Sequence, residues 1–337
     1  MKDYKVKKSK LSNFKNKLDF WATNSEEGGW NISSTDEGSQ KMLENENEEQ
    51  IKIQTGTEVL DDFVIDEETS DDERMIVNMG PQHPSTHGVL RLQAELEGEV
   101  VRRVKPIIGY LHTGMEKTGE ELNYFQGPTN TTRMDYLSPL FNELVFSLTT
   151  EKLIGIEVPE RAKTIRILMT ELNRISSHLV ALATGGMDIG ALSMMIFGFR
   201  ERELILNFFE KTTGLRMNHN FIRPGGVAAD LPDGWQKDVQ EILKVIPEKL
   251  QDYDDMLLDN PIWKGRLQNV GILTTEECFA YGITGPSLRA SGYSWDLRKS
   301  QPYSGIEKFD FEIPVLNEGD VFARWRVKVL EIFESLK

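Results

Sequence analysis

Two histidines that lie four residues apart are the first side chains in this sequence that suggest chemistry. His83 and His87 belong to the segment Gly80-Pro81-Gln82-His83-Pro84-Ser85-Thr86-His87-Gly88, ahead of the first predicted strand. Proline fixes its own φ and restricts the residue before it, so this segment is stiff and can hold an imidazole in place. Imidazole has the unperturbed pKa closest to neutrality, which suits proton transfer. A purely structural loop is the alternative, and no nearby carboxylate or cysteine completes a metal site.

Two further positions combine a reactive side chain with an unusual setting. Tyr136 lies just before an apolar helix, beside Asp135 and Ser138, either of which could serve only as the N-cap of that helix. Asp188 is a carboxylate within the most apolar stretch of the chain. A buried carboxylate needs a partner or loses its charge. We therefore expect Asp188 to be a helix cap or the counter-ion of a histidine or arginine elsewhere.

Composition and missing motifs argue against several classes of function. The 337-residue chain has a net charge of -15 and a pI of about 5.0, whereas nucleic-acid-binding proteins concentrate basic surface. The sequence contains no Gly-x-Gly-x-x-Gly motif, no Gly-x-x-x-x-Gly-Lys-Ser/Thr phosphate loop and no His-Glu-x-x-His zinc motif. Its single cysteine, Cys278, rules out an internal disulfide and any four-thiolate zinc or iron–sulfur site.

The chain divides by composition near residue 73. Residues 1–73 are basic at first and acidic later, and their few apolar residues recur without a period. This pattern predicts a disordered charged tail, with a docking arm that orders on a partner as the alternative. The folded domain is expected to span residues 74–337. Its last predicted helix, from Asp320, stops at Lys337 without a cap residue, so we expect the chain to be truncated there.

Apolar periodicity in the domain predicts an α+β fold, in which a small antiparallel sheet precedes and packs on a mainly helical core. The sheet is expected from strands at 90–96 and 100–108, joined by a turn at 97–99. Long helices are expected from about residue 159, at 192–213 with Gly214 as C-cap, and at 234–258. A short helix should follow the capping-box pair Thr274 and Glu277.

Two further segments have less regular patterns. The apolar stretch 179–199 is predicted as a helix, a break at the pair Gly185-Gly186 and a second helix. A membrane-spanning helix is the alternative, but a carboxylate in mid-membrane is costly. Residues 289–303, which are rich in glycine, serine and aromatic residues, are predicted to form a loop.

Seven segments together resemble one known family. They are residues 80–91, 109–117, 132–138, 187–190, 199–203, 222–227 and 288–292. In order and spacing they are similar to the D subunit, the quinone-site subunit, of bacterial NADH-quinone oxidoreductase (respiratory complex I). The resemblance runs continuously from about Asn78 to Lys337. One such segment would be a weak signal, whereas seven in order are a strong one.

The resemblance implies that the chain forms the pocket in which the quinone head group is reduced. The quinone-binding positions are then His87 and Tyr136, and Asp188 is the partner of His87. These three residues are the catalytic candidates. Asp188 would favour the charged imidazolium until quinone reduction removes the proton, and the altered contact would move the loop.

Other positions are assigned by the same resemblance. Arg133, Asp135 and Ser138 would surround the site, and His83 and Pro84 would keep a structural role in the loop. The family in turn resembles the large subunits of nickel–iron hydrogenases, where two metal-binding cysteines occupy the places of Asp135 and Ser138. Asp and Ser cannot supply the soft thiolates that hold nickel and iron, so no metal is expected in this chain.

The implied setting is a multisubunit enzyme. Electrons would reach quinone from an iron–sulfur cluster in a neighbouring subunit, because this chain carries no flavin or NADH motif. The partners would be other peripheral-arm subunits and a membrane-arm subunit at the quinone entrance, with no nucleic acid. The assembly would lie at the cytoplasmic face of a bacterial cell membrane and pump protons. Two alternatives stay open: a relative that oxidises ferredoxin or a reduced deazaflavin, and a scaffold without a working site.

Overall fold

The computed structural model describes residues 74–337. The predicted charged tail, residues 1–73, lies outside the described part of the chain. The chain divides into two compact units. The described residues of the first unit are 74–75 and 96–101, whereas the second unit comprises 76–95 and 102–337 and contains every candidate site residue.

A small sheet opens the described chain. Its strands are β1 (Arg74–Met79), β2 (Leu90–Glu97) and β3 (Val100–Ile108), in the order β1-β2-β3. The two-residue connection between β2 and β3 requires an antiparallel pair, and the predicted turn is confirmed. Pro106 is tolerated because β3 lies at the edge of the sheet.

Two long helices follow the predicted apolar spacing. Helix α7 (Glu160–Asp188) begins directly after Pro159, and its leucine and isoleucine face is buried from residue 172 to residue 182. Helix α8 (Leu192–Thr213) ends at Gly214, which adopts the left-handed conformation as its C-cap. Both helices are confirmed. The backbones approach closely, because a Cβ added to Gly198 would lie 2.7 Å from the Cβ of Ala183.

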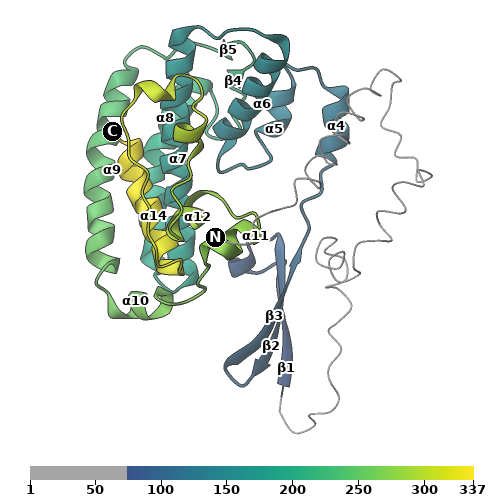
Figure 1. Cartoon of the computed structure of the whole chain (residues 1–337), viewed down its shortest axis with the longest axis vertical. Helices are drawn as coiled ribbons and strands as arrows, with labels where there is room; N and C mark the ends of the chain where they lie inside the picture. Colours follow the sequence, from purple (N-terminus) through teal and green to yellow (C-terminus); the bar gives the residue numbers. More distant parts are fainter. Residues whose placement is uncertain (1–73) are drawn as a thin grey trace, which may run out of the picture. The chain divides into compact units, whose positions relative to one another are not determined.

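Helices α9 (Trp235–Leu257) and α14 (Val321–Ser335) complete the helical core. Figure 1 shows them beside α7 and α8, in agreement with the contacts of α14 with α7 and of α9 with α8. The buried core residues come mainly from these four helices and from α6 (Pro139–Ile154). The α+β fold class is therefore confirmed, with helix as the dominant element.

Shorter elements connect the long helices. They are η3 (Pro84–Thr86), α4 (Met115–Glu121), α5 (Gly127–Thr131), the antiparallel pair β4 (Ile222–Arg223) and β5 (Gly226–Val227), α10 (Pro261–Leu267), α11 (Thr275–Ala280), α12 (Gly285–Ala290), α13 (Leu297–Ser300) and η4 (Ile306–Lys308). Helix α11 starts with the predicted capping box, in which Thr274 and Glu277 bond each other's backbone amides.

Two predictions were wrong in detail. The loop expected at 289–303 contains the end of α12 and all of α13, which the side chains of Arg289 and Arg298 tie to Glu331 and Glu171. The helix break expected at Gly185-Gly186 lies instead after Asp188. Gly186 serves close packing, because an added Cβ would lie 2.7 Å from the Cβ of Met194. None of the helices within residues 74–337 is long and apolar enough to span a membrane.

Candidate functional site

The loop between β1 and β2 is fixed by its own hydrogen bonds. His83 is the N-cap of η3, and its Nδ1 accepts from the backbone N–H of Ser85 at 3.2 Å and contacts Ser85 Oγ at 2.7 Å. Pro84 occupies the first turn of η3. The hydroxyl of Thr86 is buried and donates to the carbonyls of Pro81 and His83. These bonds fix the backbone of the loop from within.

This loop presents His87 in an uncommon backbone conformation. His87 ends η3 with φ 53° and ψ 23°, which is the left-handed region that costs a non-glycine residue free energy. Gly80 makes the turn possible, because at φ +87° an added Cβ would lie 2.1 Å from the carbonyl oxygen of Leu90. The side chain of His87 is 47% exposed. The loop thus holds an accessible imidazole on a constrained backbone.

Asp188 lies against this imidazole. The distance from His87 Nε2 to Asp188 Oδ2 is 3.7 Å, and the Asp188 side chain is 35% exposed. The structure therefore brings together two segments that are far apart in the sequence. Asp188 is the last residue of α7, not a cap at a helix start.

The position of Asp188 is electrostatically unusual. The C-terminus of a helix carries partial negative charge, so a carboxylate there is disfavoured by about 0.3–1 kcal/mol. The last turn of α7, which the structure describes throughout, contains no basic residue. Arg266 of α10 donates to the carbonyl of Ile189, the residue that follows. The Arg266 guanidinium therefore supplies positive charge at this end of α7.

Tyr136 lies in the segment between α5 and α6 and is 50% exposed. In the same segment Asp135 accepts a hydrogen bond from the N–H of Leu137 at 3.2 Å, and its carbonyl accepts from the Asn142 amide at 3.0 Å. The Arg133 guanidinium donates to the carbonyl of Thr129. The neighbours of Tyr136 therefore shape the segment and leave the phenol accessible.

Ser138 connects the Tyr136 segment to α7. It occupies the N-cap position of α6, but its side chain makes no capping bond and instead contacts Ser177 Oγ at 3.3 Å. Ser177 precedes Asp188 by eleven residues on the same helix, or about 16 Å along the axis. Helix α7 thus carries the contact to the Tyr136 segment and, near its end, the contact to His87.

The site residues lie outside two cavities of the second unit. One apolar cavity of about 450 Å³ lies between α7 and α9, and another of about 820 Å³ lies between α6 and the segment 284–303. Neither is lined by His87, Tyr136 or Asp188. Within residues 74–337 no group of three or more histidine, cysteine, aspartate or glutamate side chains is arranged to hold a metal ion.

Comparison with known proteins bears on the family. The family model described as "Respiratory-chain NADH dehydrogenase, 49 Kd subunit" matches residues 188–337. A D subunit of NADH-quinone oxidoreductase from Salinispora arenicola is 58% identical over 268 residues, which are 79% of this chain and 61% of the relative. The D subunit of NADH-quinone oxidoreductase from Mycobacteroides abscessus is 54% identical over 290 residues, which are 86% of this chain and 67% of the relative. The chain belongs to the family of these D subunits.

The family expected from the seven segments is thereby confirmed. This member of the D-subunit family spans 61% of the length of its relatives from Salinispora arenicola and Rhodococcus jostii. Asp188 is the first residue of the part that the family model matches. His87 and Tyr136 precede that part.

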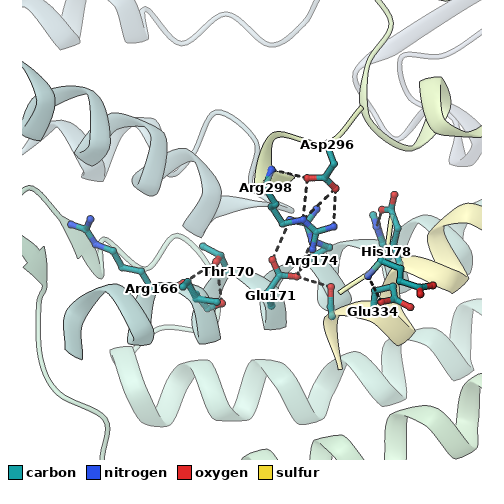
Figure 2. A network of polar contacts seen from close by, with 12 residues as sticks. Arg166, Thr170, Glu171, Arg174, His178, Asp296, Arg298 and Glu334 are labelled. Carbon is teal, nitrogen blue, oxygen red and sulfur yellow. Dashed lines mark hydrogen bonds and ion pairs between the residues drawn. The ribbon is translucent and has the colours of Figure 1, made fainter. Parts of the chain in front are cut away.

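Sequence reasoning missed a largely buried polar network on α7 of this D-subunit family member. Figure 2 shows Glu171 and Arg174 of α7 with Asp296 and Arg298. Arg298 contacts Asp296 at 2.8 Å and Glu171 at 3.2 Å, and Arg174 contacts Glu171 at 3.1 Å. Burial alone would raise the pKa of the Glu171 carboxyl, but the two guanidinium groups outweigh it and lower that pKa.

A second buried cluster lies farther along α7. His178 Nε2 and Glu331 Oε2 are 2.7 Å apart, and Arg289 Nε donates to Glu331 Oε1 at 2.7 Å. A sequence signal for α7 existed, because Glu171, Arg174 and His178 recur at helical spacing within an apolar pattern. The partners on α12 and α14 carried no such signal. Both clusters hold α7, the helix that bears Asp188, in place.

Proposed function

We propose that this chain is the quinone-site subunit of a proton-translocating NADH-quinone oxidoreductase, with the quinone head group held by His87 and Tyr136. The contact between His87 and Asp188 carries the proposal, because it joins an accessible imidazole to a carboxylate at a helix end that favours positive charge. Membership in the D-subunit family supports the same reaction. The relatives from Salinispora arenicola and Mycobacteroides abscessus are named as D subunits of NADH-quinone oxidoreductase.

The chemistry of the head group fits two opposed donors. A quinone takes up two electrons and two protons to become a quinol, and negative charge develops on its two carbonyl oxygens as the electrons arrive. Donors aimed at these oxygens stabilise that charge. A ring N–H of an imidazolium and a phenol O–H can each donate a hydrogen bond and then release a proton. His87 and Tyr136 supply these two groups, and both are accessible.

Asp188 faces the proton-donating ring of His87. A carboxylate attracts a protonated imidazole, so Asp188 holds the ring in position while its proton is transferred to the quinone. Once that proton has moved to the quinone oxygen, the attraction between the ring and Asp188 weakens. The constrained backbone at His87 then favours a shift of the loop. In the assembled enzyme this local shift is the start of coupling to proton pumping.

The remaining predicted residues support these three. His83 and Pro84 hold the loop of His87 through η3. Arg133, Asp135 and Ser138 shape the segment of Tyr136 through their contacts with backbone and with α7. The fold that positions the His87 loop and the Tyr136 segment is proposed to be that of the nickel–iron hydrogenase large subunits. The pocket that holds the metals in those proteins would bind quinone here.

Other subunits complete the reaction. Electrons come from an iron–sulfur cluster in a neighbouring peripheral-arm subunit, and quinone enters past a membrane-arm subunit. The exposure of Tyr136 and His87 supports a pocket whose remaining walls are supplied by these partners. The chain is proposed to lie in the peripheral arm, at the cytoplasmic face of the bacterial membrane, and to be inactive alone.

Kinetics of the assembled complex test the proposal. His87→Ala should lower kcat/KM for quinone by about a hundredfold, because a proton-donating group is lost. Tyr136→Phe should lower it by about tenfold, because one hydrogen bond to developing charge is lost. Tyr281→Phe, which removes an exposed phenol with no assigned role, should leave it unchanged. Normal quinone reduction by both site variants, in fully assembled enzyme, would refute the site.

A further inference from the structure

We infer that Asn173, a buried residue of α7, is a positioning residue that fixes Tyr136 at the quinone; this inference rests on the proposed function. Asn173 is 2% exposed. Its Oδ1 accepts from the backbone N–H of Leu140 at 3.1 Å, and its Nδ2 donates to the carbonyl of Leu137 at 3.0 Å. The side-chain amide of Asn173 thus forms hydrogen bonds with the backbone on both sides of the start of α6.

The first of these bonds replaces a missing helix cap. The opening amides of a helix have no partner within the helix, and the N-cap side chain normally accepts from one of them. Ser138 occupies the N-cap position of α6 but makes no such bond. Asn173 supplies the acceptor from another helix and bonds the second residue of α6. The start of α6 is therefore defined by α7.

The second bond reaches the peptide group next to Tyr136. Leu137 directly follows Tyr136, so holding the Leu137 carbonyl limits rotation of the backbone that carries the phenol. Ser177, one turn farther along α7, contacts Ser138 and adds a second anchor. At the other end of the segment, the Thr132 hydroxyl donates to the buried carboxylate of Glu143 at 2.7 Å. The segment is fixed at both ends while Tyr136 stays accessible.

Helix α7 then sets the spacing of the two quinone-binding groups. Asn173 and Asp188 lie on one continuous helix, fifteen residues or about 22 Å apart along its axis. Asn173 fixes the segment of Tyr136 and Asp188 contacts His87. A hydrogen-bonding group that moves by about 1 Å loses much of its effect on a reaction, up to about a hundredfold. Loss of the Asn173 amide should therefore impair the use of Tyr136.

A double-mutant cycle in the assembled complex tests this role. Asn173→Ala should raise KM for quinone about tenfold in the enzyme that retains Tyr136. In the Tyr136→Phe background the same change should have little further effect, because the group that it positions has lost its hydroxyl. An equal rise of KM in both backgrounds would overturn the inference, since a general structural defect adds to the effect of Tyr136→Phe.

Two further variants make the cycle decisive. Asn173→Asp keeps the side-chain volume and the acceptor for the Leu140 N–H, but it places an oxygen against the Leu137 carbonyl and so loses that hydrogen bond. Its rise in KM should therefore also depend on the presence of the Tyr136 hydroxyl. Thr170→Ala is the matched control, because Thr170 is buried one turn earlier on α7 and bonds only the carbonyls of Arg166 and Ile167 in the same helix. If Thr170→Ala raised KM as much as Asn173→Ala, positioning by Asn173 would be refuted.

Failure of the proposed function gives a different result. If Tyr136→Phe alone left KM and kcat unchanged, Tyr136 would not act on quinone and the proposed site would fail. If Tyr136→Phe impaired the enzyme but Asn173→Ala and Asn173→Asp did not, only the positioning role would fail. Full assembly of each variant is checked by NADH oxidation with an artificial acceptor that bypasses quinone.

Discussion

Two histidine–carboxylate pairs involve α7, and they differ in almost every physical respect. The side chains of His178 and Glu331 are 11% and 0% exposed and their atoms are 2.7 Å apart. The side chains of His87 and Asp188 are 47% and 35% exposed and their atoms are 3.7 Å apart. The buried pair joins α7 to α14, whereas the exposed pair joins α7 to a loop. The same chemistry thus serves structure in one place and remains available to a ligand in the other.

Electrostatics explain why the buried pair is fixed. Burial lowers the pKa of His178, so the ring is neutral and donates to Glu331. Burial alone would raise the pKa of Glu331, but the hydrogen bond from His178 and the charge of Arg289 outweigh it and lower that pKa to about 2. Near neutral pH this cluster therefore has one protonation state, with the charges of Glu331 and Arg289 compensating each other.

The largest expected difference between the pairs is in stability. Glu331→Ala should lower the free energy of unfolding by about 3–5 kcal/mol, because it leaves Arg289 buried without its counter-ion. Asp188→Ala should change that free energy by less than about 1 kcal/mol, because exposed pairs contribute little. Urea unfolding of the purified chain measures both values. Similar losses for the two variants would contradict the division into a structural and a functional pair.

A third histidine extends the comparison to pH. Burial lowers the pKa of His219 to about 4, below its ordinary value of 6.5. Between pH 4 and 6.5, His219 is therefore protonated in the unfolded chain but neutral in the folded chain. The contribution of neutral His219 to the free energy of unfolding is complete above pH 6.5 and is lost as pH falls toward 4. The loss should be about 3 kcal/mol from this residue. Urea unfolding at several pH values should show this slope reduced in His219→Gln; an unchanged slope would contradict the assignment.

The smallest of these effects falls on activity. Asp188→Asn should lower quinone reductase activity of the assembled complex about tenfold, because the carboxylate that holds the proton-donating ring of His87 is lost. Stability should stay within about 1 kcal/mol of the wild type. Steady-state kinetics and urea unfolding give the two numbers. A large loss of stability with normal kinetics would place Asp188 with the buried pair instead.

Much of the fold could be predicted from local patterns. The spacing of apolar residues placed the start of α7 and both ends of α8 nearly to the residue, and Thr274 with Glu277 marked the start of α11. Such features depend on residues within one or two turns of each other, which a single sequence displays directly. The loop prediction for residues 289–303 was wrong because the short helices there depend on distant partners such as Glu331.

Local sequence patterns predicted less of the functional site. The side chains of His87, Tyr136 and Asp188 suggested proton chemistry, but their association came from family resemblance and no local pattern pairs His87 with Asp188. The hydrogen bonds from Asn173 to the start of α6 were not predicted, because an asparagine inside a helix has many possible partners. The end of α7 was placed too early, since Gly186 allows close packing against Met194 and neither Gly185 nor Gly186 breaks the helix.

Photolabelling of the assembled complex with an azido-quinone tests the assignment of the quinone site most directly. We expect the label to attach to peptides containing residues 80–88 or 133–138, excess quinone to prevent it, and His87→Ala to reduce it strongly. Attachment elsewhere in the complex, with both peptides unlabelled and the reaction still prevented by excess quinone, would contradict the assignment of the quinone head group to His87 and Tyr136.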